Sequence, residues 1–98
     1  MGTDGQARAT IFVSGRVQGV GFRWWTRSRA LELGLAGQAR NLLDGRVEVV
    51  AQGSRADVEK LEHMLREFPS GTGRPGHVTA VTTQWSEPRD GVSGFREA

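Results

Sequence analysis

The stretch GRVQGVGFR, residues Gly15–Arg23, contains three glycines and two arginines and lies between two segments of different periodicity. Before it, Ala9–Ser14 (ATIFVS) is rich in β-branched and aromatic residues, which are typical of a strand. After it, Phe22–Leu33 carries apolar residues at helical spacing, and Gly34 is well placed to end a helix. The stretch is therefore expected to join the end of a strand to the start of a helix.

Two short strands are predicted after this helix, over Leu35–Asn41 and Arg46–Gln52. The dipeptide Asp44-Gly45 between them is a strong signal for a tight hairpin turn. We therefore expect the two strands to pair with each other in antiparallel fashion.

A second helix is predicted after Ser54, because Asp57 three residues later gives a spacing typical of a helix N-cap. Its apolar positions recur at helical spacing, and Pro69 ends it. These positions are Val58, Leu61, Leu65 and Phe68. A fourth strand is predicted over His77–Trp85, and Phe95 is expected to start a short last strand.

The resulting order, β-α-β-β-α-β, matches the ferredoxin-like plan of the α+β class. This plan is an antiparallel sheet, here of four to five strands, with two helices packed on one face. Residues 1–8 are small and polar and are expected to form a loose tail. Residues 9–98 are then expected to form a single domain, which suits a chain of 98 residues.

The composition is that of an ordinary globular protein, with 37% hydrophobic and 24% charged residues. There is no cysteine, which excludes a disulfide framework and thiolate chemistry. No apolar run is long enough to span a membrane, and the N-terminal residues lack the layout of a signal peptide. The expected location is the cytoplasm.

The positive charge is carried almost entirely by arginine, with twelve Arg and one Lys, a net charge of +2 and a pI near 10.4. Arginine favours planar contacts with phosphate and carboxylate groups. The same surplus is compatible with nucleic-acid binding, or with a compositional habit of the genome.

The Gly15–Arg23 stretch has the features of an anion-binding turn. A helix N-terminus exposes unpaired backbone N–H groups and carries partial positive charge. Gly19 and Gly21 can adopt positive φ, which lets successive N–H groups converge on one anion. Arg23, in the first helical turn, could grip two phosphate oxygens with its guanidinium. The stretch is neither a Walker loop nor a dinucleotide fingerprint, and a tight turn that binds nothing is the alternative.

Two separated motifs resemble the acylphosphatase family. The stretch Gly15–Arg23 is similar to the family's phosphate-binding signature. Downstream, the family's second motif is similar to Leu33–Leu35 with Gly37, followed by Arg40–Leu42 and Asp44–Val49. The resemblance extends from Ala9 to Phe68 and, more weakly, to Trp85. It implies a ferredoxin-like fold, in agreement with the order of elements predicted above.

The resemblance also implies a reaction, which is hydrolysis of an acyl phosphate to a carboxylate and inorganic phosphate. Arg23 would bind the phosphoryl group, and Asn41 would orient the attacking water. Backbone N–H groups from about Gln18 to Arg23 would hold the phosphate oxygens. The full set of expected phosphate-binding residues is Gly15, Arg16, Val17, Gln18, Gly19, Val20, Gly21, Phe22 and Arg23.

No cofactor or metal is expected. His63 and His77 have no partner at metal-ligand spacing, and Ser14 and Ser28 have no adjacent base. A carboxylate leaves an acyl phosphate as a stable anion, so a general acid is dispensable. Phosphoryl transfer depends mainly on positioning and electrostatics, which N–H donors and one arginine can supply. The expected partners are the small-molecule acyl phosphate and inorganic phosphate, with no nucleic acid or membrane, and the chain is expected to be a monomer.

Other interpretations of the same residues stay open. Arg23 alone would be an ordinary surface arginine, and Asn41 alone a residue preceding a turn. A nucleic-acid-binding module would need exposed aromatic residues on its central strands, and Arg46–Gln52 has none. A phosphate sensor without catalytic activity is the third hypothesis. Of the adjacent Trp24 and Trp25, one is expected in the core and the other near the loop, where it could line the acyl side of the substrate.

Overall fold

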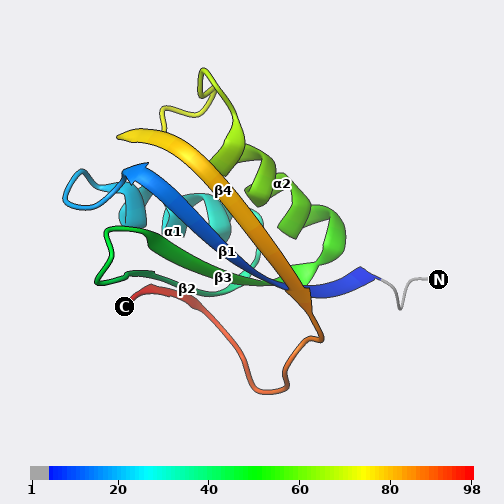
Figure 1. Ribbon diagram of the computed structural model, residues 1–98. Coiled ribbons are helices and arrows are strands. Elements are labelled where there is room, and N and C mark those ends of the chain that lie inside the picture. Colours follow the sequence, from blue (N-terminus) through cyan, green and yellow to red (C-terminus); the bar gives the residue numbers. More distant parts are fainter. Residues whose placement is uncertain (1–4) are drawn as a thin grey trace.

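The computed structural model describes residues 5–98 and contains the predicted elements in the predicted order, including the short last strand that starts at Phe95 (Figure 1). The fold class inferred from the sequence is confirmed. The elements are β1 (Gln6–Arg16), α1 (Phe22–Glu32), β2 (Ala36–Asn41), β3 (Val47–Ser54), α2 (Arg55–Arg66), β4 (His77–Ser86) and β5 (Phe95–Glu97).

The five strands form one sheet in the order β4-β1-β3-β2-β5. The four longer strands pair in antiparallel fashion, but β5 pairs parallel to β2. The sheet is therefore mixed, and the expectation of a purely antiparallel sheet is wrong for its last pair. The reason lies in the connection between β4 and β5. A loop that turns back at one end of the sheet must reverse the chain direction, and the direction opposite to β4 is that of β2.

The first strand begins earlier than the sequence predicts. Gln6, Ala7 and Arg8 pair with residues of β3, so residues 6–8 belong to the sheet and not to a loose tail. Ala7 is buried between two polar neighbours, as in a strand with one buried face. This pattern is hard to recognise in the sequence, because it covers only three residues and the buried side chain is a small alanine. Residues 1–4 of the predicted tail lie outside the described residues.

The core lies between the two helices and one face of the sheet, and both helices cover that same face (Figure 1). Helix α1 packs against β2 and β5, and α2 packs against β1, β3 and β4. Along each strand, successive side chains point to opposite faces of the sheet. Ile11 on β1 and Val49 on β3 are fully buried on the helix-covered face, and their neighbours along the chain point to the other face. Helix α2 buries the expected apolar residues except Phe68, which is 80% exposed because the helix ends at Arg66.

Candidate active site

The last part of β1 requires glycine at position 15, one residue before the strand ends. The pairing of β1 with β4 shifts register between Ser14 and Gly15, and Gly15 has a φ of 129°. A Cβ atom at Gly15 would overlap the backbone carbonyl oxygen of His77 on β4. Glycine therefore lets β1 change register at this point and stay paired with β4 up to Arg16, after which the chain leads to α1.

Helix α1 starts without the usual cap. Its N-cap residue is Gly21, with φ 86°, which has no side chain to accept a hydrogen bond, and the first turn contains no acidic residue. Helix α2 differs in both respects, since Ser54 Oγ accepts a hydrogen bond of 3.1 Å from the Asp57 N–H, and Asp57 lies in the first turn. The chain thus satisfies the N-terminus of α2 and leaves that of α1 available to an external anion.

The backbone N–H groups of residues 18–24 find no hydrogen-bond acceptor in the part of the chain that the structure describes. The first internal bond of this region is donated by the Trp25 N–H to the Gly21 carbonyl oxygen, at 3.0 Å. Several free donors on a glycine-containing turn before a helix make a concave site for an oxyanion.

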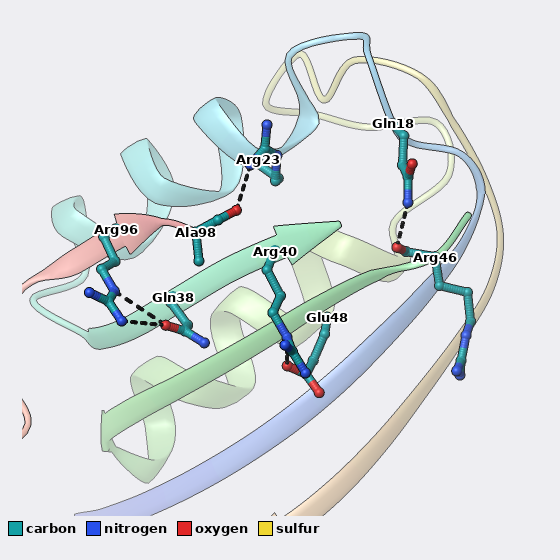
Figure 2. Close-up of polar contacts among 8 residues, drawn as sticks. All are labelled: Gln18, Arg23, Gln38, Arg40, Arg46, Glu48, Arg96 and Ala98. Atoms are coloured by element: carbon teal, nitrogen blue, oxygen red, sulfur yellow. Dashed lines mark hydrogen bonds and ion pairs between the residues drawn. The ribbon is translucent and has the colours of Figure 1, made fainter. Parts of the chain in front are cut away.

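Gln18 ties this turn to the hairpin between β2 and β3. Its side-chain Nε2 donates to the carbonyl oxygens of Leu42, at 2.8 Å, and Arg46, at 2.9 Å. Figure 2 shows the side chain reaching from the loop to Arg46. Both side-chain N–H groups are therefore engaged, and Gln18 can offer a phosphate only its backbone N–H. The same contact brings the loop next to Asn41, the neighbour of Leu42.

Arg23 projects from the first turn of α1 toward the end of β2. Its Nη1 donates a 2.7 Å hydrogen bond to the backbone oxygen of Ala98 (Figure 2). The Ala98 N–H in turn donates to the carbonyl oxygen of Ala39, at 2.8 Å. Within residues 5–98, neither Arg23 nor Arg16 has an Asp or Glu carboxylate within 4 Å. No acidic side chain of the described residues therefore neutralises the positive charge at the turn.

Asn41 ends β2 with its side chain on the helix-covered side of the sheet. Asn41 pairs with Val47 of β3 and lies two positions after the buried Ala39. The side chains of Asn41 and Ala39 therefore point to the same face of the sheet. Asn41 itself is exposed, and its carboxamide makes no hydrogen bond to any residue that the structure describes. The carboxamide is therefore available to water or to a substrate.

The remaining expected site residues contribute mainly backbone. The side chains of Val17 and Phe22 are buried in the core, and this packing holds the loop in position. Of the two tryptophans, Trp25 is 3% exposed and Trp24 is 61% exposed beside Arg23, as expected of such a pair. Across residues 5–98, no group of three or more His, Asp or Glu side chains could hold a metal ion.

Two contacts at the site were missed by the sequence interpretation. The acceptors of Gln18 are carbonyl oxygens of the hairpin, and the acceptor of Arg23 is the oxygen of Ala98. Every residue has a carbonyl group, so these partners give no signal in the sequence. The glutamine in a glycine-rich turn was the one available hint, because such a turn offers few side chains able to hold it in place.

Fold and site together define a class, namely a ferredoxin-like α+β protein with an anion-binding turn between its first strand and first helix. Comparison with known proteins narrows this class. The family model for acylphosphatase matches residues 9–97. The chain therefore belongs to the acylphosphatase family, and its reaction is the hydrolysis of an acyl phosphate.

Similar proteins cover nearly the whole chain. An acylphosphatase from Mycolicibacterium vanbaalenii is 58% identical over 94 residues, which are 96% of this chain and 97% of that protein. One from Corynebacterium glutamicum (strain R) is 60% identical over 92 residues, with coverage of 94% and 97%. The solved structure of an acylphosphatase from Coxiella burnetii superimposes with a TM-score of 0.82 at 36% identity, covering 96% of this chain and 94% of that one.

Proposed function

We propose that the Gly15–Arg23 turn holds the phosphoryl group of the acyl phosphate, that Arg23 binds its oxygens and that Asn41 orients the attacking water. The observation that carries this proposal is the set of N–H groups over residues 18–24 without an acceptor in the described chain, beside an arginine without an Asp or Glu partner there. Such donors stabilise the charge that builds up on the equatorial oxygens in the transition state.

The reaction needs little further help from the protein. Water attacks phosphorus, the bond between phosphorus and the acyl oxygen breaks, and the carboxylate leaves with the electron pair. A carboxylate is a stable anion near neutral pH, so its oxygen does not have to be protonated as it leaves. The proton of the attacking water passes to a phosphate oxygen, and the products are a carboxylate and inorganic phosphate.

Asn41 suits the task of orienting water better than that of activating it. A carboxamide oxygen accepts a hydrogen bond but is a poor base, and the group stays neutral over the whole physiological pH range. Its exposed position at the end of β2, joined through Leu42 to the Gln18 contact, supports a role next to the bound phosphate.

The first experiment compares wild type and Asn41→Ala for hydrolysis of benzoyl phosphate in the presence of EDTA. We expect rapid hydrolysis by the wild type, near-complete loss in Asn41→Ala, and unchanged competitive inhibition by inorganic phosphate in the variant. Gln84→Ala is the control, because Gln84 is another exposed carboxamide, on β4. Full turnover by Asn41→Ala would show that the water is oriented by another group.

The same experiment separates an enzyme from a phosphate sensor. A folded wild-type chain that binds phosphate without hydrolysing benzoyl phosphate would be a sensor. Loss of wild-type activity caused by EDTA alone would contradict the proposed independence from metal.

We further propose that the chain acts as a monomer in the cytoplasm. Over residues 5–98 the structure has no helix long and apolar enough to cross a membrane. Light scattering on the purified protein tests the first part of this proposal, and cell fractionation tests the second.

A further inference from the structure

The face of the sheet that the helices leave uncovered carries several arginines. Two of them are neutralised locally. Arg40 Nε lies 2.7 Å from Glu48 Oε1, which Figure 2 shows across β2 and β3, and Arg46 Nε lies 2.8 Å from Asp44 Oδ2. These pairs are the ordinary solution for charges on an exposed sheet face.

Three other arginines on this side have a different environment. Within residues 5–98, Arg8, Arg89 and Arg96 have no carboxylate within 4 Å. Arg96 donates through Nε, at 3.3 Å, and Nη2, at 3.2 Å, to the amide oxygen of Gln38 (Figure 2). Arg8 Nη1 donates to the amide oxygen of Gln52, at 3.1 Å. Neutral amides thus orient these two guanidinium groups and leave their charge in place.

Gln52 also holds the loop that carries Arg89. Its Nε2 donates to the Arg89 carbonyl oxygen, at 2.8 Å, and its Oε1 accepts from the Arg89 N–H, at 2.9 Å. This reciprocal pair fixes the loop between β4 and β5 next to Arg8. Burial lowers the pKa of the Arg8 guanidinium, and the positive charge of Arg89 lowers it further. The described chain therefore keeps like charges close together without a compensating anion.

A cavity of about 390 Å³ lies at this point, between the open sheet face and the loop. Arg8, Gln38 and Arg96 supply polar side chains to its wall, and Val50 and Val92 supply apolar ones. The volume is in the range of small-molecule sites, which are lined mostly by apolar groups with a few polar groups that fix orientation. The cavity shares no lining residue with the Gly15–Arg23 turn.

We propose that this cavity binds a small organic anion, with its oxyanion group, a carboxylate or a phosphate, placed between Arg8 and Arg96 and its apolar part against Val50 and Val92. An oxyanion would neutralise charges that the described chain leaves unpaired, and guanidinium groups bind both kinds of oxyanion through paired hydrogen bonds. The amides of Gln38 and Gln52 already hold the two guanidinium groups in place, so less side-chain freedom is lost on binding.

The test is a titration of the ¹⁵N-labelled protein, followed by amide shifts, with citrate as the carboxylate probe and phenyl phosphate as the phosphate probe. Saturable shifts at Gly37, Gly91 and Gly94 report on the cavity, whereas Gly19 and Gly21 report separately on the catalytic turn. We expect at least one probe to shift the first group, and the more effective probe identifies the preferred oxyanion.

Variants decide whether the arginines carry this binding. Arg96→Ala and Arg8→Gln are each expected to weaken it about 10-fold, the size of one lost charge-assisted hydrogen bond. Arg40→Ala is the matched control on the same face and is expected to change it less than about 2-fold, because Arg40 is already paired with Glu48. No saturable shift with either probe, or equal affinity in all variants, would overturn the proposal. Neither result bears on catalysis, because activity is not the readout.

Discussion

Arg23 and Asn41 contribute to the proposed site in different ways, because one side chain is a cation and the other is neutral. The guanidinium of Arg23 supplies positive charge as well as N–H donors. The carboxamide of Asn41 adds no charge and acts only by orienting a water molecule through a hydrogen bond. Loss of Arg23 should therefore weaken binding of the phosphoryl group as well as turnover, whereas loss of Asn41 should affect turnover alone.

Arg23→Ala is expected to lower kcat/KM for benzoyl phosphate by roughly 10²–10⁴-fold and to weaken inhibition by inorganic phosphate. Arg23→Lys should recover only part of the loss, because an ammonium cannot make the paired contact of a guanidinium. Steady-state kinetics with phosphate as inhibitor measure both effects. If phosphate inhibits Arg23→Ala as strongly as it inhibits the wild type, Arg23 does not bind the phosphoryl group.

Gly15 is expected to tolerate no side chain. In Gly15→Ala the new Cβ would meet the His77 carbonyl oxygen at a φ of 129°, so we expect a loss of unfolding free energy of about 2 kcal/mol or more. Gly19→Ala is the matched control, since Gly19 also has positive φ, at 74°, but open space around its Cβ position. Its cost should be the backbone strain alone, about 1–2 kcal/mol. Urea denaturation measures both, and equal losses would argue against the steric account.

At the scale of elements, the β2–β3 hairpin supports the site through backbone groups. The turn at Asp44-Gly45 was predicted from the sequence and is confirmed, because its signal lies in two adjacent residues. Asp44 Oδ1 accepts a hydrogen bond from the Arg46 N–H, at 3.1 Å. The carbonyl oxygens that hold Gln18 are presented by this same turn.

The pKa of Asp44 should be lower than the ordinary value of 3.8. The largest cause is the hydrogen bond from the backbone N–H of Arg46, and the Arg46 side chain adds its own bond and charge, while burial acts in the opposite direction. A lowered folded pKa means that the ionised carboxylate stabilises the hairpin above the unfolded pKa, near pH 4, and that this contribution is lost as the pH falls through the folded pKa.

A carboxyl ¹³C titration measures the Asp44 pKa directly. In Arg46→Ala the value should rise toward 3.8 without reaching it, since the backbone bond remains. A variant with an unchanged pKa would show that the side-chain pair has no effect in solution.

The difference between local and long-range contacts explains what the sequence could predict. Signals confined to neighbouring residues, such as the strand–turn–helix stretch around Gly15–Arg23, were sufficient for the order of the elements. Contacts between distant segments were not accessible, because Arg23 and Ala98 are 75 residues apart and the acceptor is a backbone oxygen. The parallel pairing of β5 was missed for a related reason, since three residues carry no periodicity.

At the scale of the whole molecule, β5 connects the two regions whose arginines have no Asp or Glu partner in the described chain. Phe95 and Arg96 line the cavity on the open face, and the oxygen of Ala98, directly after β5, accepts from Arg23 at the catalytic turn. Within residues 5–98, β5 lies at the edge of the sheet and pairs with β2 alone. A strand of three residues at the edge of a sheet depends on such side-chain contacts to stay in register.

Arg27 provides the contact that we expect to hold β5 against α1, because its Nε donates to the Phe95 carbonyl oxygen at 3.0 Å. Arg27→Ala should therefore speed hydrogen exchange at the Ala98 and Gly37 amides, whose acceptors are Ala39 and Gly94. Loss of this charged hydrogen bond is expected to cost about 1.5–3 kcal/mol of local stability, or roughly 10–100-fold in exchange rate. With β5 less firmly held, Arg23 loses a fixed acceptor, so KM for benzoyl phosphate should rise more than kcat falls.

Arg29→Ala is the control for this prediction, since Arg29 lies on the same helix but pairs with Glu32. Faster exchange without a change in KM would show that β5 does not position Arg23.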